Sequence, residues 1–124
     1  MNKYTFMVLL IFSYPVHAAI NADVYEKAMS NSESRGQMMS YVWGVGSGFE
    51  MANVDIEVHR TGKPLYCPPP EMVLTTENYL NILDARLKEV STVKKETLGA
   101  EGYISLIEYE LLQGLKKTFP CKGN

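Results

Sequence analysis

The sequence predicts a small all-α domain of four helices, stapled by one disulfide, with an irregular loop between the second and third helices. Apolar residues recur at spacings of three and four in four separate segments, which is typical of amphipathic helices. Only the first five or six residues of the stretch 53–66 alternate polar and apolar side chains as a strand does. The chain has 124 residues and no internal repeat, which favours a single domain.

The first 18 residues have the pattern of a secretory signal peptide. Lys3 supplies a basic start, residues 6–12 form a short apolar run, and the segment ends in the small side chain of Ala18. The apolar run is far shorter than the roughly 20 residues of a membrane span. We therefore expect cleavage after Ala18 to leave a domain of residues 19–124 in the periplasm, with no membrane attachment.

The charge of the chain is nearly balanced. Twelve basic and 14 acidic residues give a net charge of −2, which becomes −3 when Lys3 is removed with the signal peptide. A surface that binds nucleic acid normally carries an excess of positive charge. The composition therefore excludes nucleic acid as an expected partner.

The chain contains two cysteines, Cys67 and Cys121. Two thiols in a small exported domain normally form a disulfide. The cysteines are 54 positions apart, so a bridge would stabilise the fold by about 4 kcal/mol through the entropy of the unfolded chain. The mature chain has one histidine, His59, and no Cys-x-x-Cys motif. We therefore predict a structural disulfide, with neither a metal site nor a redox site.

The first helix is predicted over residues 22–30 and the second over residues 35–52. The second helix has glycines at Gly44 and Gly48, on one face beside its apolar stripe. Because a glycine in a helix costs about 1 kcal/mol relative to alanine, we expect another backbone to approach closely there. The run Gly44-Val45-Gly46-Ser47-Gly48 lacks the spacing of a phosphate-binding loop, so no nucleotide site is predicted.

Residues 53–66 are the irregular stretch. Val54, Ile56 and Val58 alternate with charged residues, which indicates a short edge strand or an extended loop. Long loops in small domains often bind partners, and a passive connector is the alternative. The candidate partner-binding residues of this segment are Asp55, Glu57, His59, Arg60 and Lys63.

The third helix is predicted over residues 75–90, with Thr75 or Thr76 as its N-cap. We expect a loop to begin at Ser91, and the last helix to span residues 100–118 and end before Pro120. The acidic residues of these two helices are interpreted as solvent-exposed: Asp84, Glu89, Glu101, Glu108 and Glu110.

No set of catalytic residues is evident. Nucleophilic catalysis requires a serine or cysteine beside a base, and both cysteines are assigned to the disulfide. His59 stands alone in the mature chain and no serine lies in a Gly-x-Ser-x-Gly motif. We therefore predict a protein that is not an enzyme and has no cofactor.

Several motifs together resemble the Rap1a/Tai family of type VI secretion immunity proteins. They are the glycine-containing helix of residues 41–48, Cys67-Pro68, Tyr79-Leu80 in the third helix, and Phe119-Pro120-Cys121. The resemblance covers roughly residues 41–121. It implies an all-α fold, a Cys67–Cys121 bridge and a periplasmic location. The charged segment of residues 53–63 matches no family motif, so contact residues are not carried over.

The resemblance also implies a function. Members of this family bind and block a cell-wall amidase delivered by neighbouring bacteria, commonly as dimers. The leading hypothesis is therefore a periplasmic immunity protein that occludes the active site of such an effector, as a monomer or a homodimer. Two alternatives remain: an accessory protein of a secretion or conjugation apparatus, and a small acid-stress chaperone.

Overall fold

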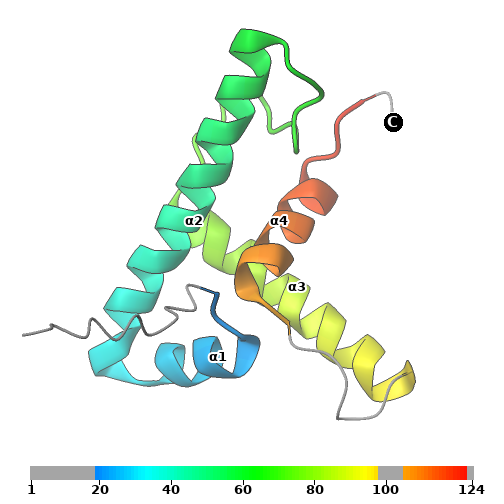
Figure 1. Cartoon of the computed structure of the whole chain (residues 1–124). Coiled ribbons are helices and arrows are strands. Elements are labelled where there is room, and N and C mark those ends of the chain that lie inside the picture. The colour runs from blue at the N-terminus through cyan, green and yellow to red at the C-terminus, as the bar shows by residue number, and fades with distance from the viewer. Residues whose placement is uncertain (1–18, 98–104, 123–124) are drawn as a thin grey trace, which may run out of the picture.

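The computed structural model describes residues 19–97 and 105–122, so the predicted signal peptide lies outside the described residues. The chain forms α1 (Ala22–Ser30), α2 (Ser32–His59), α3 (Thr76–Thr97) and α4 (Ile107–Thr118) (Figure 1). Within the described ranges there is no strand, and the backbone of Asn21 makes an isolated bridge with Leu106. The all-α prediction, with a loop between the second and third helices, is confirmed.

The longest helix, α2, runs along one side of the molecule, and each of the other three helices packs against it. In Figure 1, α1 lies against the first half of α2, while α3 and α4 pack on each other and on α2. A hydrogen bond also ties α1 to α3, because the Tyr25 hydroxyl donates to Asp84 Oδ1 at 2.7 Å. Burial, and then this carboxylate, raise the pKa of Tyr25 well above its usual value. Each helix therefore contributes to one core.

The core lies where the four helices meet. Most of its side chains belong to the predicted helical stripes, but Tyr66 and Leu74 come from the segment between α2 and α3. In α1 the buried residue is Tyr25, whereas Val24 is half exposed. The buried apolar residues are Tyr25, Met38, Val42, Tyr66, Leu74, Tyr79, Leu80, Leu83, Leu87, Ile107, Leu111 and Leu115.

Helix α2 is longer than predicted. It begins at Ser32, where the Asn31 side chain caps the Glu33 N–H, and it continues to His59. The prediction that residues from 53 onward are irregular was therefore wrong for residues 53–59. The helix continues through residue 53 because the buried side chain of Asn53 binds the chain that returns after the helix. Its Oδ1 accepts from the Leu65 N–H at 2.7 Å and its Nδ2 donates to the Tyr66 carbonyl at 2.8 Å. The returning chain is thus fastened to a continuous helix.

The boundaries of the last two helices also differ from the predictions. Thr75, one of the two predicted alternatives, is the N-cap of α3. Its N–H donates to Asn78 Oδ1, and its hydroxyl oxygen accepts from the Asn78 N–H. Helix α3 continues to Thr97, so a loop does not begin at Ser91. Residues 105 and 106 are extended because their backbone pairs with residues 20–22, and α4 therefore begins at Ile107 rather than near residue 100. Residues 98–104 lie outside the described ranges.

The predicted disulfide is present. Cys67 and Cys121 are bonded, with their Cα atoms 4.9 Å apart. The Cys67 N–H also donates to the Phe119 carbonyl at 2.8 Å. The bridge therefore fastens the proline-rich segment that precedes α3 to the end of α4.

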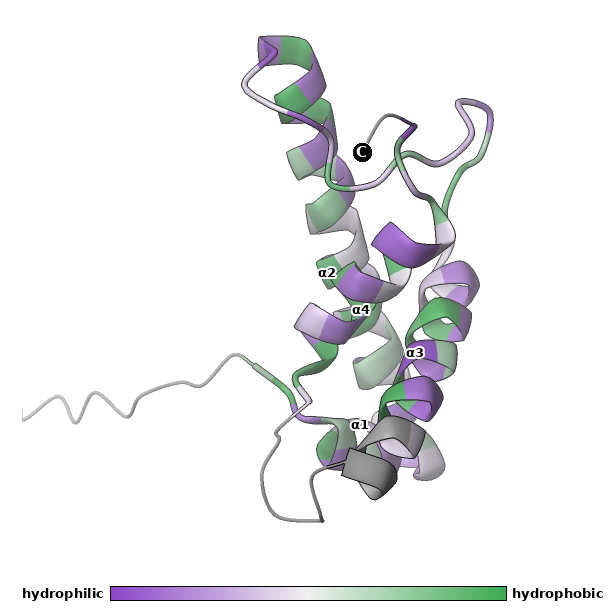
Figure 2. Ribbon diagram, turned by 90° about the vertical axis from the view of Figure 1, so that its right-hand side faces the viewer, coloured by the Kyte–Doolittle hydropathy of each residue, from purple (hydrophilic) through white to green (hydrophobic). Residues whose placement is uncertain are grey.

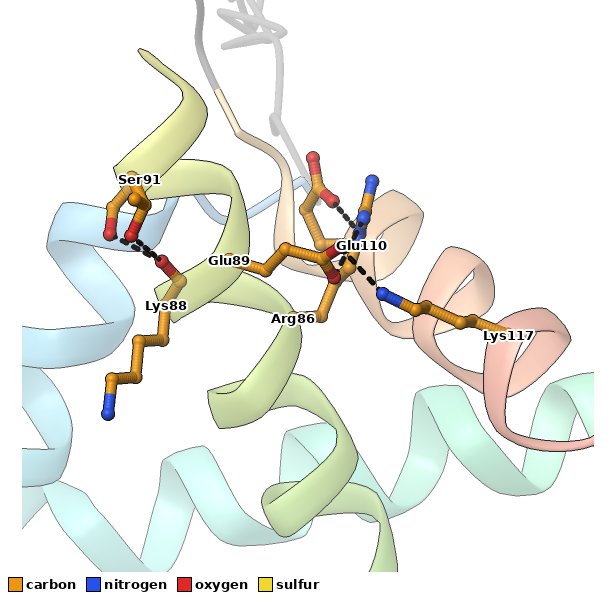
Figure 3. Close-up of polar contacts among 7 residues, drawn as sticks. Arg86, Lys88, Glu89, Ser91, Glu110 and Lys117 are labelled. Carbon is orange, nitrogen blue, oxygen red and sulfur yellow. Dashed lines mark hydrogen bonds and ion pairs between the residues drawn. The ribbon is translucent and has the colours of Figure 1, made fainter. Parts of the chain in front are cut away.

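The interpretation of the acidic residues as solvent-exposed was wrong for Glu110, which has no exposed surface, and for the carboxylate of Glu108, one oxygen of which is buried. Arg86 in α3 donates from Nε to Glu110 Oε2 at 3.0 Å and from Nη1 to Glu89 at 3.2 Å. Lys117 in α4 donates to the other oxygen of Glu89 at 2.6 Å (Figure 3). The two cations lower the pKa of Glu89, with the Lys117 hydrogen bond as the largest cause. Charged side chains therefore join α3 to α4 beside the core.

The close approach to α2 occurs at a different glycine from the two predicted. A Cβ atom on Gly46 would lie 2.6 Å from three ring atoms of Tyr79, whereas nothing lies within 4 Å of such an atom on Gly44 or Gly48. The contact partner is thus an aromatic ring of α3 and not a backbone. Tyr79 is fully buried, so its ring could make room for a methyl group only by displacing other core side chains.

We expect Gly46→Ala to lower the free energy of unfolding by about 1–3 kcal/mol, because the added methyl group overpacks the core. Gly44→Ala is the matched control in the same helix, and we expect it to stabilise the protein by up to about 1 kcal/mol through its helix propensity. Urea unfolding followed by circular dichroism measures both. Equal effects of the two substitutions would contradict the packing seen at Gly46.

Candidate functional site

The last turns of α2 project beyond the rest of the fold. In Figures 1 and 2 the end of this helix extends past the other three helices, and the following segment folds back beside it. Most side chains of residues 51–63 are exposed, and Asn53 is the buried one. We call residues 51–63 the α2 tip.

The five candidate partner-binding residues all lie on the α2 tip. Asp55, Glu57 and His59 belong to the last turns of the helix, Arg60 ends it in a left-handed conformation, and Lys63 lies in the returning segment. The predicted loop is therefore mainly a helix end. Among these residues, His59 Nδ1 lies 3.0 Å from Asp55 Oδ1, and both side chains are more than half exposed. Such an exposed pair contributes little to stability. Both side chains are therefore accessible at the surface.

The α2 tip also carries an exposed apolar stripe. Met51, Val54 and Val58 are three and four residues apart and share one side of the helix, with exposures of 63%, 48% and 69%. Met72 and Val73, in the segment before α3, are exposed at 43% and 81%. Contiguous apolar side chains on a surface are characteristic of interaction sites. This stripe could not be recognised from the sequence because Val54 and Val58 also fit the period of two of a strand.

A groove of about 530 Å³ lies between the second half of α2 and residues 66–72. Met51, Val54, Met72 and the three prolines of residues 68–70 supply its apolar walls. Glu50 and Glu57 supply two carboxylates, and no basic side chain lines it. Neither carboxylate forms an ion pair with another described residue. The groove is therefore apolar with a negative charge.

Two tyrosine side chains lie close to this groove. Tyr66 lines it, and burial together with the charge of Glu50 raises the pKa of Tyr66 to about 12. Burial and Glu50 also raise the pKa of Tyr79 well above its usual value. Both hydroxyls therefore keep their protons at neutral pH, and the carboxylates carry the charge of the groove.

Within residues 19–97 and 105–122, no three His, Cys, Asp or Glu side chains are arranged to hold a metal ion. Over the same part of the chain, no helix is sufficiently long and apolar to cross a bilayer.

Comparison of the chain with protein-family models, with curated proteins and with solved structures found no match. The Rap1a/Tai resemblance therefore stays a prediction from the sequence motifs.

Proposed function

We propose that the mature domain is a periplasmic immunity protein. It would bind an effector enzyme delivered by neighbouring bacteria, with a peptidoglycan amidase as the expected class, and occlude the active site of that enzyme. The observation that carries this proposal is the α2 tip, a projecting helix end with an exposed apolar stripe beside charged side chains. The motif resemblance supports the class of partner, and the tip supports binding through a protruding element.

The composition of the α2 tip favours a protein partner. Interfaces between proteins combine a central apolar contact with a polar rim. Here Val54 and Val58 supply apolar surface, while Asp55, His59 and Arg60 supply polar and charged surroundings. A projecting helix end has the shape to enter a concave site.

The adjacent groove indicates the chemistry of the partner's side of the contact. Glu50 and Glu57 are acidic, and the remaining walls are largely apolar. Complementary charge favours correct pairing and a faster encounter. A partner segment that places a lysine or arginine beside apolar residues therefore fits the groove best.

The experiment is an inhibition assay with purified proteins. The mature domain is mixed with each cell-wall amidase effector of the same strain, and peptidoglycan hydrolysis is measured. We expect stoichiometric inhibition of one effector by the wild type. We expect Val54→Asp combined with Val58→Asp to weaken inhibition by about 100-fold or more, because charges would be buried in the contact.

Val24→Asp is the matched control. Val24 is half exposed like Val54, but it lies on α1 and away from the α2 tip. This variant should inhibit as well as the wild type. If the wild type inhibits none of the amidases, the proposed function is wrong. If the double variant inhibits fully, the function stands and the α2 tip is not the contact surface.

A further inference from the structure

A carboxylate near the predicted start of the mature chain has one oxygen without a partner. Glu108, in the first turn of α4, accepts hydrogen bonds at Oε1 from the Tyr41 hydroxyl and from the Ile20 N–H, the latter at 2.9 Å. Its second oxygen, Oε2, is buried and has no hydrogen-bond partner among the described residues. A buried carboxylate oxygen that lacks a partner is costly, so it indicates a missing donor.

The path of the chain brings one candidate donor, the Ala19 nitrogen, near Glu108. Residues 20–22 pair with residues 105–107 through the Ile107 N–H to Ile20 carbonyl bond at 2.8 Å and the Ala22 N–H to Ser105 carbonyl bond at 2.9 Å. This pairing holds the beginning of the described chain beside the start of α4 (Figure 1). Ala19 precedes Ile20 directly, and consecutive backbone nitrogens lie no more than about 3.6 Å apart.

We propose that Glu108 is a binding site for the chain's own α-ammonium group, which forms when signal peptidase cleaves between Ala18 and Ala19. In that reaction water adds across the peptide bond, giving the Ala18 carboxylate and the Ala19 amine, which takes up a proton. The new ammonium group donates to Glu108 Oε2. Cleavage therefore completes the junction between the amino terminus and α4. This inference does not depend on the identity of the effector.

The groups around Glu108 suit this role. The hydroxyl of Tyr41, in α2, donates a hydrogen bond to the Glu108 carboxylate. Burial, together with this hydrogen bond, raises the pKa of Tyr41 to about 12. Tyr41 therefore stays neutral while an α-amino group, with an ordinary pKa of about 8, gains or loses its charge. In the precursor, Ala19 carries a neutral amide, which cannot form an ion pair.

The first test identifies the mature amino terminus and measures its effect on stability. Mass spectrometry of the exported protein should give a chain that begins at Ala19. A chain with a free Ala19 amine should melt roughly 5 °C higher at pH 6 than the same chain with an acetylated amine. The difference should disappear above about pH 9, where the free amine loses its charge.

Glu108→Gln provides the control, because it keeps hydrogen bonds to Ile20 and Tyr41 but removes the charge. The free and acetylated forms of this variant should melt at the same temperature. Acylation of the Ala19 amine in the native protein should also be about tenfold slower in the wild type than in Glu108→Gln, which provides a readout independent of stability. A mature chain that begins elsewhere, or an acetylation effect that persists in Glu108→Gln, would overturn the proposal.

Discussion

Replacing Cys67 and Cys121 together with alanine is expected to lower the free energy of unfolding by about 4 kcal/mol. The disulfide joins cysteines 54 positions apart, and the unfolded chain gains the corresponding entropy when the bridge is removed. Small domains have a total stability of about 5–15 kcal/mol, so the variant should be near the limit of folding. Urea unfolding of the two proteins measures the difference.

Two controls separate the bridge from the packing of its sulfur atoms. Wild type treated with a reducing agent keeps both side chains and should lose nearly as much stability as the double alanine variant. Thiol titration of the unreduced, denatured wild type should find no reactive thiol. Two reactive thiols, or a loss below about 1 kcal/mol, would show that the bridge does not hold the domain together.

The second large effect is expected at Arg86, where substitution by methionine should cost about 3–5 kcal/mol. Glu110 has no exposed surface, and the substitution removes the cation that lies 3.0 Å from its carboxylate. A buried charge that loses its counter-charge is strongly destabilising. Thermal and urea unfolding measure the loss.

A second substitution distinguishes the charge effect from lost packing. The variant Arg86→Met with Glu110→Leu removes both charges and should recover most of the stability, because apolar pairs often replace buried ion pairs without loss. Lys117→Ala is the exposed control in the same network, and it should change stability little. If the double variant is as unstable as Arg86→Met, the cost does not arise from the loss of the Arg86 charge beside Glu110.

The helices, their number and the disulfide could be predicted because each depends on local signals. Apolar spacing marks each helix, and a chain with two cysteines allows only one intramolecular pairing. The length of α2 could not be predicted in this way. Val54, Ile56 and Val58 suit a strand as well as a helix, and the choice is made by Asn53, whose partners Leu65 and Tyr66 lie 12 and 13 residues away.

The candidate site was predictable in part. The charged residues of the segment between the second and third predicted helices do lie together on the α2 tip. The groove was not predictable, because it forms only when residues 66–72 return beside α2. The burial of Glu110 depends in the same way on Arg86, 24 residues earlier in the chain. Contacts between residues far apart in the chain leave no periodic pattern in the sequence, so they cannot be predicted from it.

The fastening of Asn53 to the returning chain has a consequence for the motion of the α2 tip. Beyond Asn53 the helix has fewer than two further turns, which are too short to be stable alone in water. The backbone amides of these turns should therefore exchange with solvent by local opening, while those of the core exchange only on global unfolding. A partner that binds the α2 tip has to order it. Part of the favourable contact energy is therefore offset by the conformational entropy that the tip loses. Dissociation of such a complex can begin with fraying of the helix end.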